Sequence, residues 1–115
     1  MKPATKTPCK QCPFRRTAPR GYLGSYSSPA DFLASHYHAD VPAPCHCSID
    51  YEKEGWEADW KAGKVGRLCA GQAALYRNSC KEPRPPTPIT PADDANPDVF
   101  DWTHEFLAHH MRDIP

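Results

Sequence analysis

The sequence of 115 residues has few apolar residues and no long apolar run. Its first eight residues are charged, polar or proline apart from Met1 and Ala4, so we expect no secretory signal peptide. No later stretch approaches the length that a membrane-spanning helix requires, and hydrophobic residues make up only 39% of the chain. We therefore expect one domain with a modest core, the size class that often adds a metal, disulfides or a partner.

Net charge and recognisable catalytic motifs are missing as well. The formal net charge is zero, which argues against a chain that binds nucleic acid over its whole surface. The sequence contains no phosphate-binding loop, no nucleophile elbow, no His-Glu-x-x-His pattern and no internal repeat. Six glycines stand against fourteen prolines, which indicates a stiff, loop-rich chain with short elements.

Cysteine, in contrast, is plentiful. An even count of six could form three disulfides, but the absence of a signal peptide favours the reducing cytoplasm. There, a cysteine cluster is more often metal-binding or catalytic. Cys80 stands apart from the rest, near the end of a predicted helix, and we expect it to be a small buried residue.

The spacing of the other cysteines predicts one metal site built from three segments. Thiolates three residues apart, as in Cys9-x-x-Cys12, can converge on one ion from a single turn. We predict that Cys45 and Cys69 complete the set of ligands. Two alternates remain open beside Cys45, namely His46 and Cys47.

Zn²⁺ is the expected metal, because it takes thiolate and imidazole ligands and stabilises small folds. A [4Fe–4S] cluster is the alternative, since it also takes four cysteines and a proline directly after a ligand, here Pro13. A third possibility is a redox dithiol of Cys9 and Cys12, although no βαβ pattern surrounds it. We expect the other histidines to be ordinary surface or core-edge residues: His36, His38, His104, His109 and His110.

Charge is segregated along the chain. Residues 1–20 carry six basic side chains and no acid, whereas residues 91–115 carry six acids and one arginine. The two ends could pair with each other, or the basic end could meet phosphate or an acidic protein. The residues predicted to contact nucleic acid or a protein partner are Lys10, Arg15, Arg16, Arg20, Trp102 and Phe106.

The fold class predicted is a small, metal-stabilised, mostly α single domain of short helices and irregular loops, with room for a minor β-hairpin near residues 46–50. Ser28-Pro29 predicts a helix start, with Ser28 as the N-cap. Further helices are predicted near 54–62, where two tryptophans lie four apart, and over 67–78, where Asn78 would cap the end.

The chain divides by composition into three parts. Residues 1–82 form a cysteine-rich metal-binding core, and residues 83–95 form a proline-rich strap, most simply a rigid connector. Asn96-Pro97 predicts the start of a C-terminal amphipathic helix within residues 96–115. Its apolar surface should dock on the core or on a partner.

The order Cys-x-x-Cys-Pro-Phe-Arg, Pro-Cys-His, Cys-Ala-Gly resembles a family of small cysteine-rich proteins of actinobacteria and bacteriophages, catalogued as a domain of unknown function. The matching residues are Cys9, Cys12, Pro13, Phe14, Arg15, Pro44, Cys45, His46, Cys69, Ala70, Gly71, Asn78, Lys81, Pro83 and Arg84. The resemblance implies that Cys9, Cys12, Cys45 and Cys69 are the shared set, with Cys47 and Cys80 as local additions. It also implies that the chain is phage-encoded, and it carries no activity with it.

These patterns favour a non-enzymatic, metal-stapled module that acts on a host or phage protein in the cytoplasm, away from membranes. One alternative is an enzyme, either a metal-dependent hydrolase or a thiol redox protein with an iron–sulfur cluster or a dithiol. The other is a regulator that binds nucleic acid through its basic N-terminal region, which would make binding steeply salt-dependent.

Overall fold

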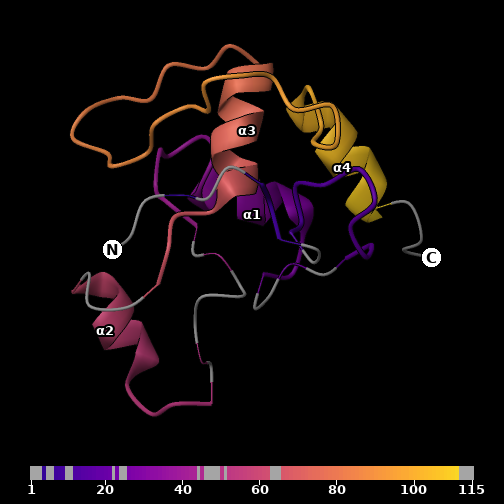
Figure 1. Ribbon diagram of the computed structural model, residues 1–115. Helices are drawn as coiled ribbons and strands as arrows, with labels where there is room; N and C mark the ends of the chain where they lie inside the picture. Colours follow the sequence, from indigo (N-terminus) through magenta and orange to yellow (C-terminus); the bar gives the residue numbers. More distant parts are fainter. Residues whose placement is uncertain are drawn as a thin grey trace.

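The described part of the chain forms four short helices in the computed structural model (Figure 1). The structure describes residues 4, 7–9, 12–21, 23, 26–43, 45, 50, 52–62 and 66–111. The helices are α1 (Pro29–Ser35), α2 (Trp56–Lys61), α3 (Ala70–Asn78) and α4 (Thr103–Met111). The radius of gyration of 13.4 Å matches the ~13 Å expected of one compact domain of this length. The prediction of a small, mostly helical single domain is confirmed.

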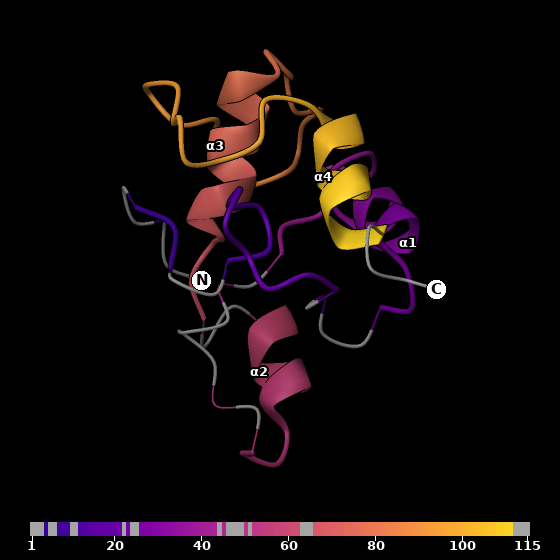
Figure 2. The ribbon, with the colours of Figure 1, turned by 90° about the vertical axis from the view of Figure 1, so that its right-hand side faces the viewer.

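Helix α1 begins where its sequence predicts. The Ser28 side chain accepts a hydrogen bond from the Asp31 N–H at 3.1 Å, and Pro29 occupies the first turn. Phe32 and Leu33 are buried, and α1 packs against α4. Figure 2 shows these two helices side by side, next to the central α3.

Helix α3 begins at Ala70, three residues later than predicted. The preceding residues form an antiparallel pairing instead: Cys45 N–H donates to Arg67 O at 2.9 Å, and Cys69 N–H donates to Ala43 O at 3.1 Å. This pairing joins two segments that are distant in the sequence. Helix propensity, which depends on neighbouring residues, does not predict it. The predicted β pairing near 46–50 falls mainly on residues outside the described part of the chain.

The end of α3 corrects two predictions. Cys80 has a positive φ of 56°, and the Lys81 N–H donates to Tyr76 O at 2.8 Å, as in a Schellman cap. Cys80 is therefore the left-handed residue that ends the helix, and it is exposed rather than buried. Asn78 is the last helical residue and not the cap.

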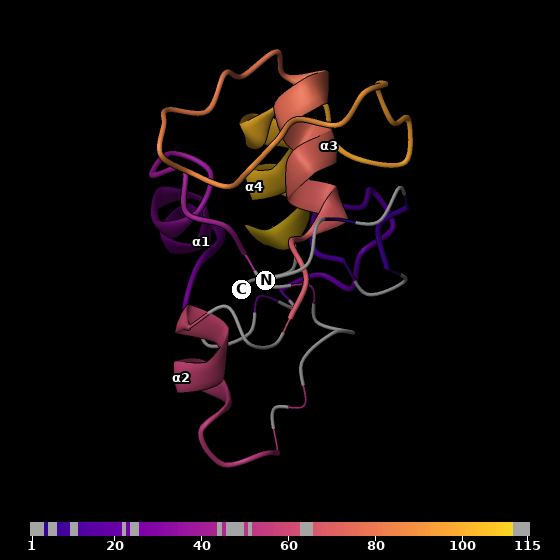
Figure 3. The same ribbon diagram turned by 60° about the vertical axis from the view of Figure 1, so that its left-hand side comes forward.

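The proline strap and the segment after it fold back over α3 (Figure 3). The Ala92 N–H donates to Ala73 O at 3.0 Å, and Ile89 is buried. The predicted helix start at Asn96-Pro97 is wrong, because the Asn96 side chain instead closes a local turn by accepting the Asp98 N–H at 2.9 Å.

Helix α4 starts only at Thr103, and its Glu105 carboxylate accepts the N–H groups of Asp101 and Trp102 just before the helix. Phe106 and His110 bury one face of α4 against the core.

Helix α2 lies away from the other three helices in all the ribbon views (Figures 1–3). It begins at Trp56, inside the predicted range of 54–62, but none of its residues is buried. In the described segments, no helix is long and apolar enough to cross a membrane.

Candidate metal centre

The Cys9-x-x-Cys12 segment forms a tight turn held by its own backbone and by an arginine. The Cys12 N–H donates to Cys9 O at 3.1 Å, and the Arg15 N–H donates to Cys12 O at 3.1 Å. The Arg15 guanidinium then donates back to Cys9 O at 2.7 Å and also to Pro8 O. Arg15, predicted to contact a partner, therefore supports the turn that carries the two cysteines.

Cys12 lies directly against Cys69, although 57 positions separate them in the sequence. Their sulfur atoms are 3.7 Å apart, too far for a disulfide bond at ~2 Å and within reach of a weak S–H···S hydrogen bond. The relative exposure of Cys12 is 1% and that of Cys69 is 7%, so neither thiol is accessible to a bulky reactant. The structure thus brings together two of the four predicted ligands.

The start of α3 shapes the electrostatics of this pair. Cys69 is the N-cap residue of α3. A hydrogen bond from the Cys12 thiol lowers the pKa of Cys69, and the backbone N–H groups of Gln72 and Gly71 lower it further. The hydrogen bond with Cys69 and burial together raise the pKa of Cys12 well above its usual value. Of the two thiols, Cys69 is therefore the one that loses its proton more readily.

Gly71 permits this close approach. A Cβ atom added at Gly71 would overlap the Cys12 sulfur and lie 2.9 Å from the Cβ of Phe14. The Cys-Ala-Gly motif therefore has a packing explanation. Its cysteine lies at the N-terminus of α3, and its glycine leaves the space that the Cys12 side chain occupies.

Cys9 and Cys45, the other two predicted ligands, are less buried than the pair. The charge of Cys9 contributes to the raised pKa of Cys12, which places Cys9 in the electrostatic neighbourhood of the pair. In the pairing of residues 43–45 with 67–69, Cys45 lies opposite Arg67 and Cys69 lies opposite Ala43. Since side chains alternate between the two faces of extended segments, Cys45 and Cys69 project from the same face of this pairing.

The described cysteines provide a close pair but not a complete centre. The part of the chain that the structure describes contains no group of three or more cysteine, histidine or acidic side chains that could hold a metal. Two alternates, His46 and Cys47, lie outside the described residues.

The residues predicted to contact nucleic acid or a partner have several different environments. The Arg16 guanidinium forms ion pairs with Asp101 and Glu105, each at 3.1 Å, so the two oppositely charged ends of the chain do pair here. Desolvation alone would raise the pKa of the Glu105 carboxyl. Hydrogen bonds from the Arg16 guanidinium and from the backbone N–H groups of Asp101 and Trp102 lower it instead. Arg20 is exposed, while Lys10 lies outside the described residues.

Of the two predicted aromatic contacts, only one is accessible. Trp102 is 51% exposed, whereas Phe106 is fully buried between Phe14 and Phe32, with ring centroids 5.4 and 5.6 Å away. Phe106 is therefore a core residue, and its prediction as a partner contact is wrong. An amphipathic pattern alone did not separate the buried ring from the exposed one.

Two histidines are buried as neutral, hydrogen-bonded groups. His110 accepts the Gly21 N–H at Nδ1 at 3.0 Å and donates from Nε2 to Pro13 O at 2.8 Å. His36 donates from Nδ1 to Val41 O and accepts the Tyr26 hydroxyl at Nε2. Burial lowers the pKa of both, as expected of packed histidines with a structural role.

Sequence reasoning missed an ionic cluster around the buried Asp40 carboxylate, at the C-terminal end of α3. The Asp40 carboxylate accepts hydrogen bonds from Tyr76 at 2.8 Å and forms ion pairs with Lys81 and Arg84 at 3.1 and 3.0 Å. These donors hold the pKa of Asp40 well below its usual range, against the opposing effect of desolvation. Its only sequence signal was that Lys81 and Arg84 belong to the Lys-x-Pro-Arg motif.

Comparison with models of protein families, with curated proteins and with solved structures gave no match to this chain.

Proposed function

We propose that the chain is a small, non-enzymatic interaction module stapled by one metal ion, with Zn²⁺ as the metal. Its ligands would be Cys9, Cys12, Cys45 and Cys69, with Cys47 or His46 as substitutes for Cys45. The single observation that carries this proposal is the 3.7 Å separation of the Cys12 and Cys69 sulfur atoms.

That separation has a simple geometric meaning. Zn–S bonds are ~2.3 Å long, so two thiolates on one tetrahedral ion lie ~3.8 Å apart. The pair of Cys12 and Cys69 already has this spacing, which supports a mononuclear site. In a [4Fe–4S] cluster, each thiolate binds a different iron atom and the sulfurs lie farther apart, so the spacing favours zinc over the cluster.

Burial supports a structural role over a catalytic one. Catalytic zinc keeps an open position for water or substrate, whereas structural zinc is enclosed by four protein ligands. Both sulfurs of the pair are almost completely covered, and the surrounding residues belong to the hydrophobic core. A closed centre in this place would join the N-terminal turn to α3, and the outer surface would be left to contact a host or phage protein.

The test compares two serine substitutions. Cys12→Ser should lose bound zinc and unfold at lower temperature, because a ligand at the centre of the core is removed. Cys80→Ser is the matched control, since Cys80 is exposed at the far end of α3, and it should keep one zinc ion per chain. Metal analysis together with thermal melting, with and without a chelator, gives the answer. Chelation that leaves the fold unchanged would refute the structural metal.

A reversible dithiol is the second candidate, favoured by the lowered pKa of Cys69 beside Cys12. It predicts a metal-free protein whose Cys12 and Cys69 form a disulfide on mild oxidation. Peptide mapping by mass spectrometry distinguishes the two candidates. The dithiol should give peptides linked by a Cys12–Cys69 disulfide, whereas the zinc protein, unfolded with a chelator and alkylated, should give two separately alkylated cysteines.

A further inference from the structure

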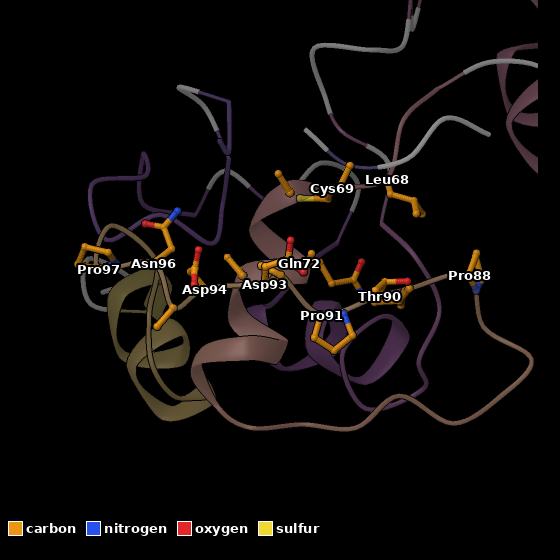
Figure 4. Close-up of a pocket in the computed structure, with 17 residues that line it drawn as sticks. Leu68, Cys69, Gln72, Pro88, Thr90, Pro91, Asp93, Asp94, Asn96 and Pro97 are labelled. Atoms are coloured by element: carbon orange, nitrogen blue, oxygen red, sulfur yellow. The ribbon is translucent and has the colours of Figure 1, made fainter. Parts of the chain in front are cut away.

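A groove runs along α3 beneath the returning strap (Figure 4). Its volume is about 500 Å³, within the range of ligand-binding clefts. Its floor consists of small side chains of α3, Ala70, Ala73 and Ala74, and its wall includes Pro91 and Pro97. The small floor residues leave space for an inserted chain, and the prolines keep the opposite wall rigid.

The strap carries one residue along this groove, Thr90, whose backbone has no hydrogen bond within the described chain. On one side of Thr90, the Ile89 N–H donates to the Thr87 hydroxyl, and on the other side the Ala92 N–H donates to Ala73 O. Thr90 itself lines the groove, is exposed, and has no hydrogen bond to the rest of the described chain. The backbone N–H and C=O groups of Thr90 are therefore available to the backbone of a bound peptide.

Two carboxylates give the groove a negative rim. Asp93 and Asp94 line it side by side, and both are exposed (Figure 4). Neither forms an ion pair with any residue in the described ranges, unlike Asp40, Asp101 and Glu105. The groove therefore combines an apolar floor with two carboxylates that have no ion-pair partner in the described part of the chain.

We propose that this groove binds a short extended segment of a partner protein, one that carries lysine or arginine beside small residues. The small side chains would lie on the alanine floor, and the cation would pair with Asp93 and Asp94. The same carboxylates would repel the phosphates of a nucleic acid, which makes a protein segment the occupant. This inference rests on the proposed role as an interaction module and names its binding surface.

The probe is the acetylated, amidated pentapeptide Ala-Lys-Ala-Lys-Ala, titrated into the ¹⁵N-labelled full chain, with Ala-Glu-Ala-Glu-Ala as the control. We expect the lysine peptide to shift the amide resonances of Ala73, Thr90 and Ala95, and to bind more weakly as salt is added. The glutamate peptide should leave these resonances in place. Equal shifts with both peptides, or none with either at millimolar concentration, would overturn the proposal.

Two double variants test whether the charges of Asp93 and Asp94, rather than the net charge of the chain, bind the lysine peptide. Asp93→Asn with Asp94→Asn should weaken binding by about fivefold, the effect of removing two exposed ion pairs. Glu82→Gln with Asp98→Asn removes the same charge from exposed acids outside the groove and should bind within about twofold of the natural chain. Equal weakening in both variants would assign the effect to net charge and refute the groove.

The metal and the groove can fail separately. Metal content and melting temperature, measured on the same samples, test whether a metal ion stabilises the fold. The peptide titration tests whether the groove binds a basic peptide. A zinc-bound, stable chain that ignores the lysine peptide would overturn the groove alone. If the resonances of the groove residues shifted when the protein was diluted, the groove would be occupied by a second copy of the chain, and the proposed partner segment would be wrong.

Discussion

Gly71 is the residue on which packing around the cysteine pair most directly depends. It lies in the first turn of α3, where a helix ordinarily gains about 1 kcal/mol when alanine replaces glycine. Here the added methyl group would overlap the Cys12 sulfur and crowd Phe14. The two effects have opposite signs, and the steric one is larger because both neighbours are fully buried.

Gly71→Ala should therefore destabilise the fold by about 1–3 kcal/mol, the usual cost of overpacking a core. Urea unfolding of the two proteins measures this difference. Ala58→Gly, at an exposed position of α2, calibrates the propensity effect alone. If Gly71→Ala proved more stable than the natural chain, the close approach of Cys12 to α3 would be wrong.

Buried histidines make stability depend on pH. His36 and His110 both have pKa values lowered from the ordinary 6.5, because burial disfavours the charged ring. The unfolded chain then binds protons more readily than the folded chain as pH falls below about 6.5. The stability from these two groups is thus present above pH 6.5 and is lost as pH falls towards their folded pKa values.

We expect the free energy of unfolding of the natural chain to fall between pH 7.5 and pH 5.5. His110→Gln should be less stable at pH 7.5, because it loses packing against Phe106, but its slope with pH should be smaller. Urea unfolding at several pH values measures both quantities. If the slope were unchanged in His110→Gln, His110 would bind protons equally well in the folded and the unfolded chain. That result would contradict a pKa lowered by burial.

At the scale of elements, Asn78 organises the segment that leads into α4. Its side-chain amide donates to the carbonyl groups of Asn96, Val99 and Phe100, and its oxygen accepts the Asn96 N–H at 2.8 Å. This one side chain at the end of α3 therefore holds residues 96–100 in their irregular path.

Asn78→Ala should cost about 2–3 kcal/mol, because several half-buried backbone groups lose their partner at once. The loss should be local, so amide hydrogen exchange of residues 96–100 should accelerate more than that of α1. Asn96→Ala is a useful comparison, since it removes the local turn contact to Asp98 but leaves the Asn78 amide in place. Uniform acceleration across the chain would contradict the local role of Asn78.

Local and distant interactions differ in how well the sequence predicts them. The start of helix α1 was predicted correctly because Ser28 and Pro29 act on the turn that follows them. The starts of α3 and α4 were placed too early because partners far along the chain take those residues: Ala43 bonds Cys69, and Asn78 bonds Asn96. Helix propensity contains no term for such long-range bonds.

The candidate centre shows the same division. The turn around Cys9 and Cys12 follows from local spacing, and residue type alone suggested that Cys69 joins it. The space that Gly71 leaves for Cys12, the buried position of Phe106 and the ion pairs of Asp40 depend on three-dimensional packing. None of these can be read from periodicity along the chain.

At the scale of the whole molecule, residues 14–16 are joined to residues 98–105 by backbone hydrogen bonds and by ion pairs. Backbone bonds pair Phe14 and Arg16 with Phe100 and Asp98, around an isolated bridge between Arg15 and Val99. The ion pairs of Arg16 reinforce this contact. The segregated charges of the sequence therefore neutralise each other in part, and the cysteine turn is held between the C-terminal segment and α3.

We propose that a metal ion joins this turn to α3, and the metal content of the purified chain shows whether it does. Elemental analysis and an absorption spectrum of the natural chain, purified without oxygen, should show a colourless protein with one zinc ion per chain. A brown protein that contains iron and sulfide would show that an iron–sulfur cluster, and not zinc, occupies the site. A colourless protein with no bound metal would contradict the metal staple altogether.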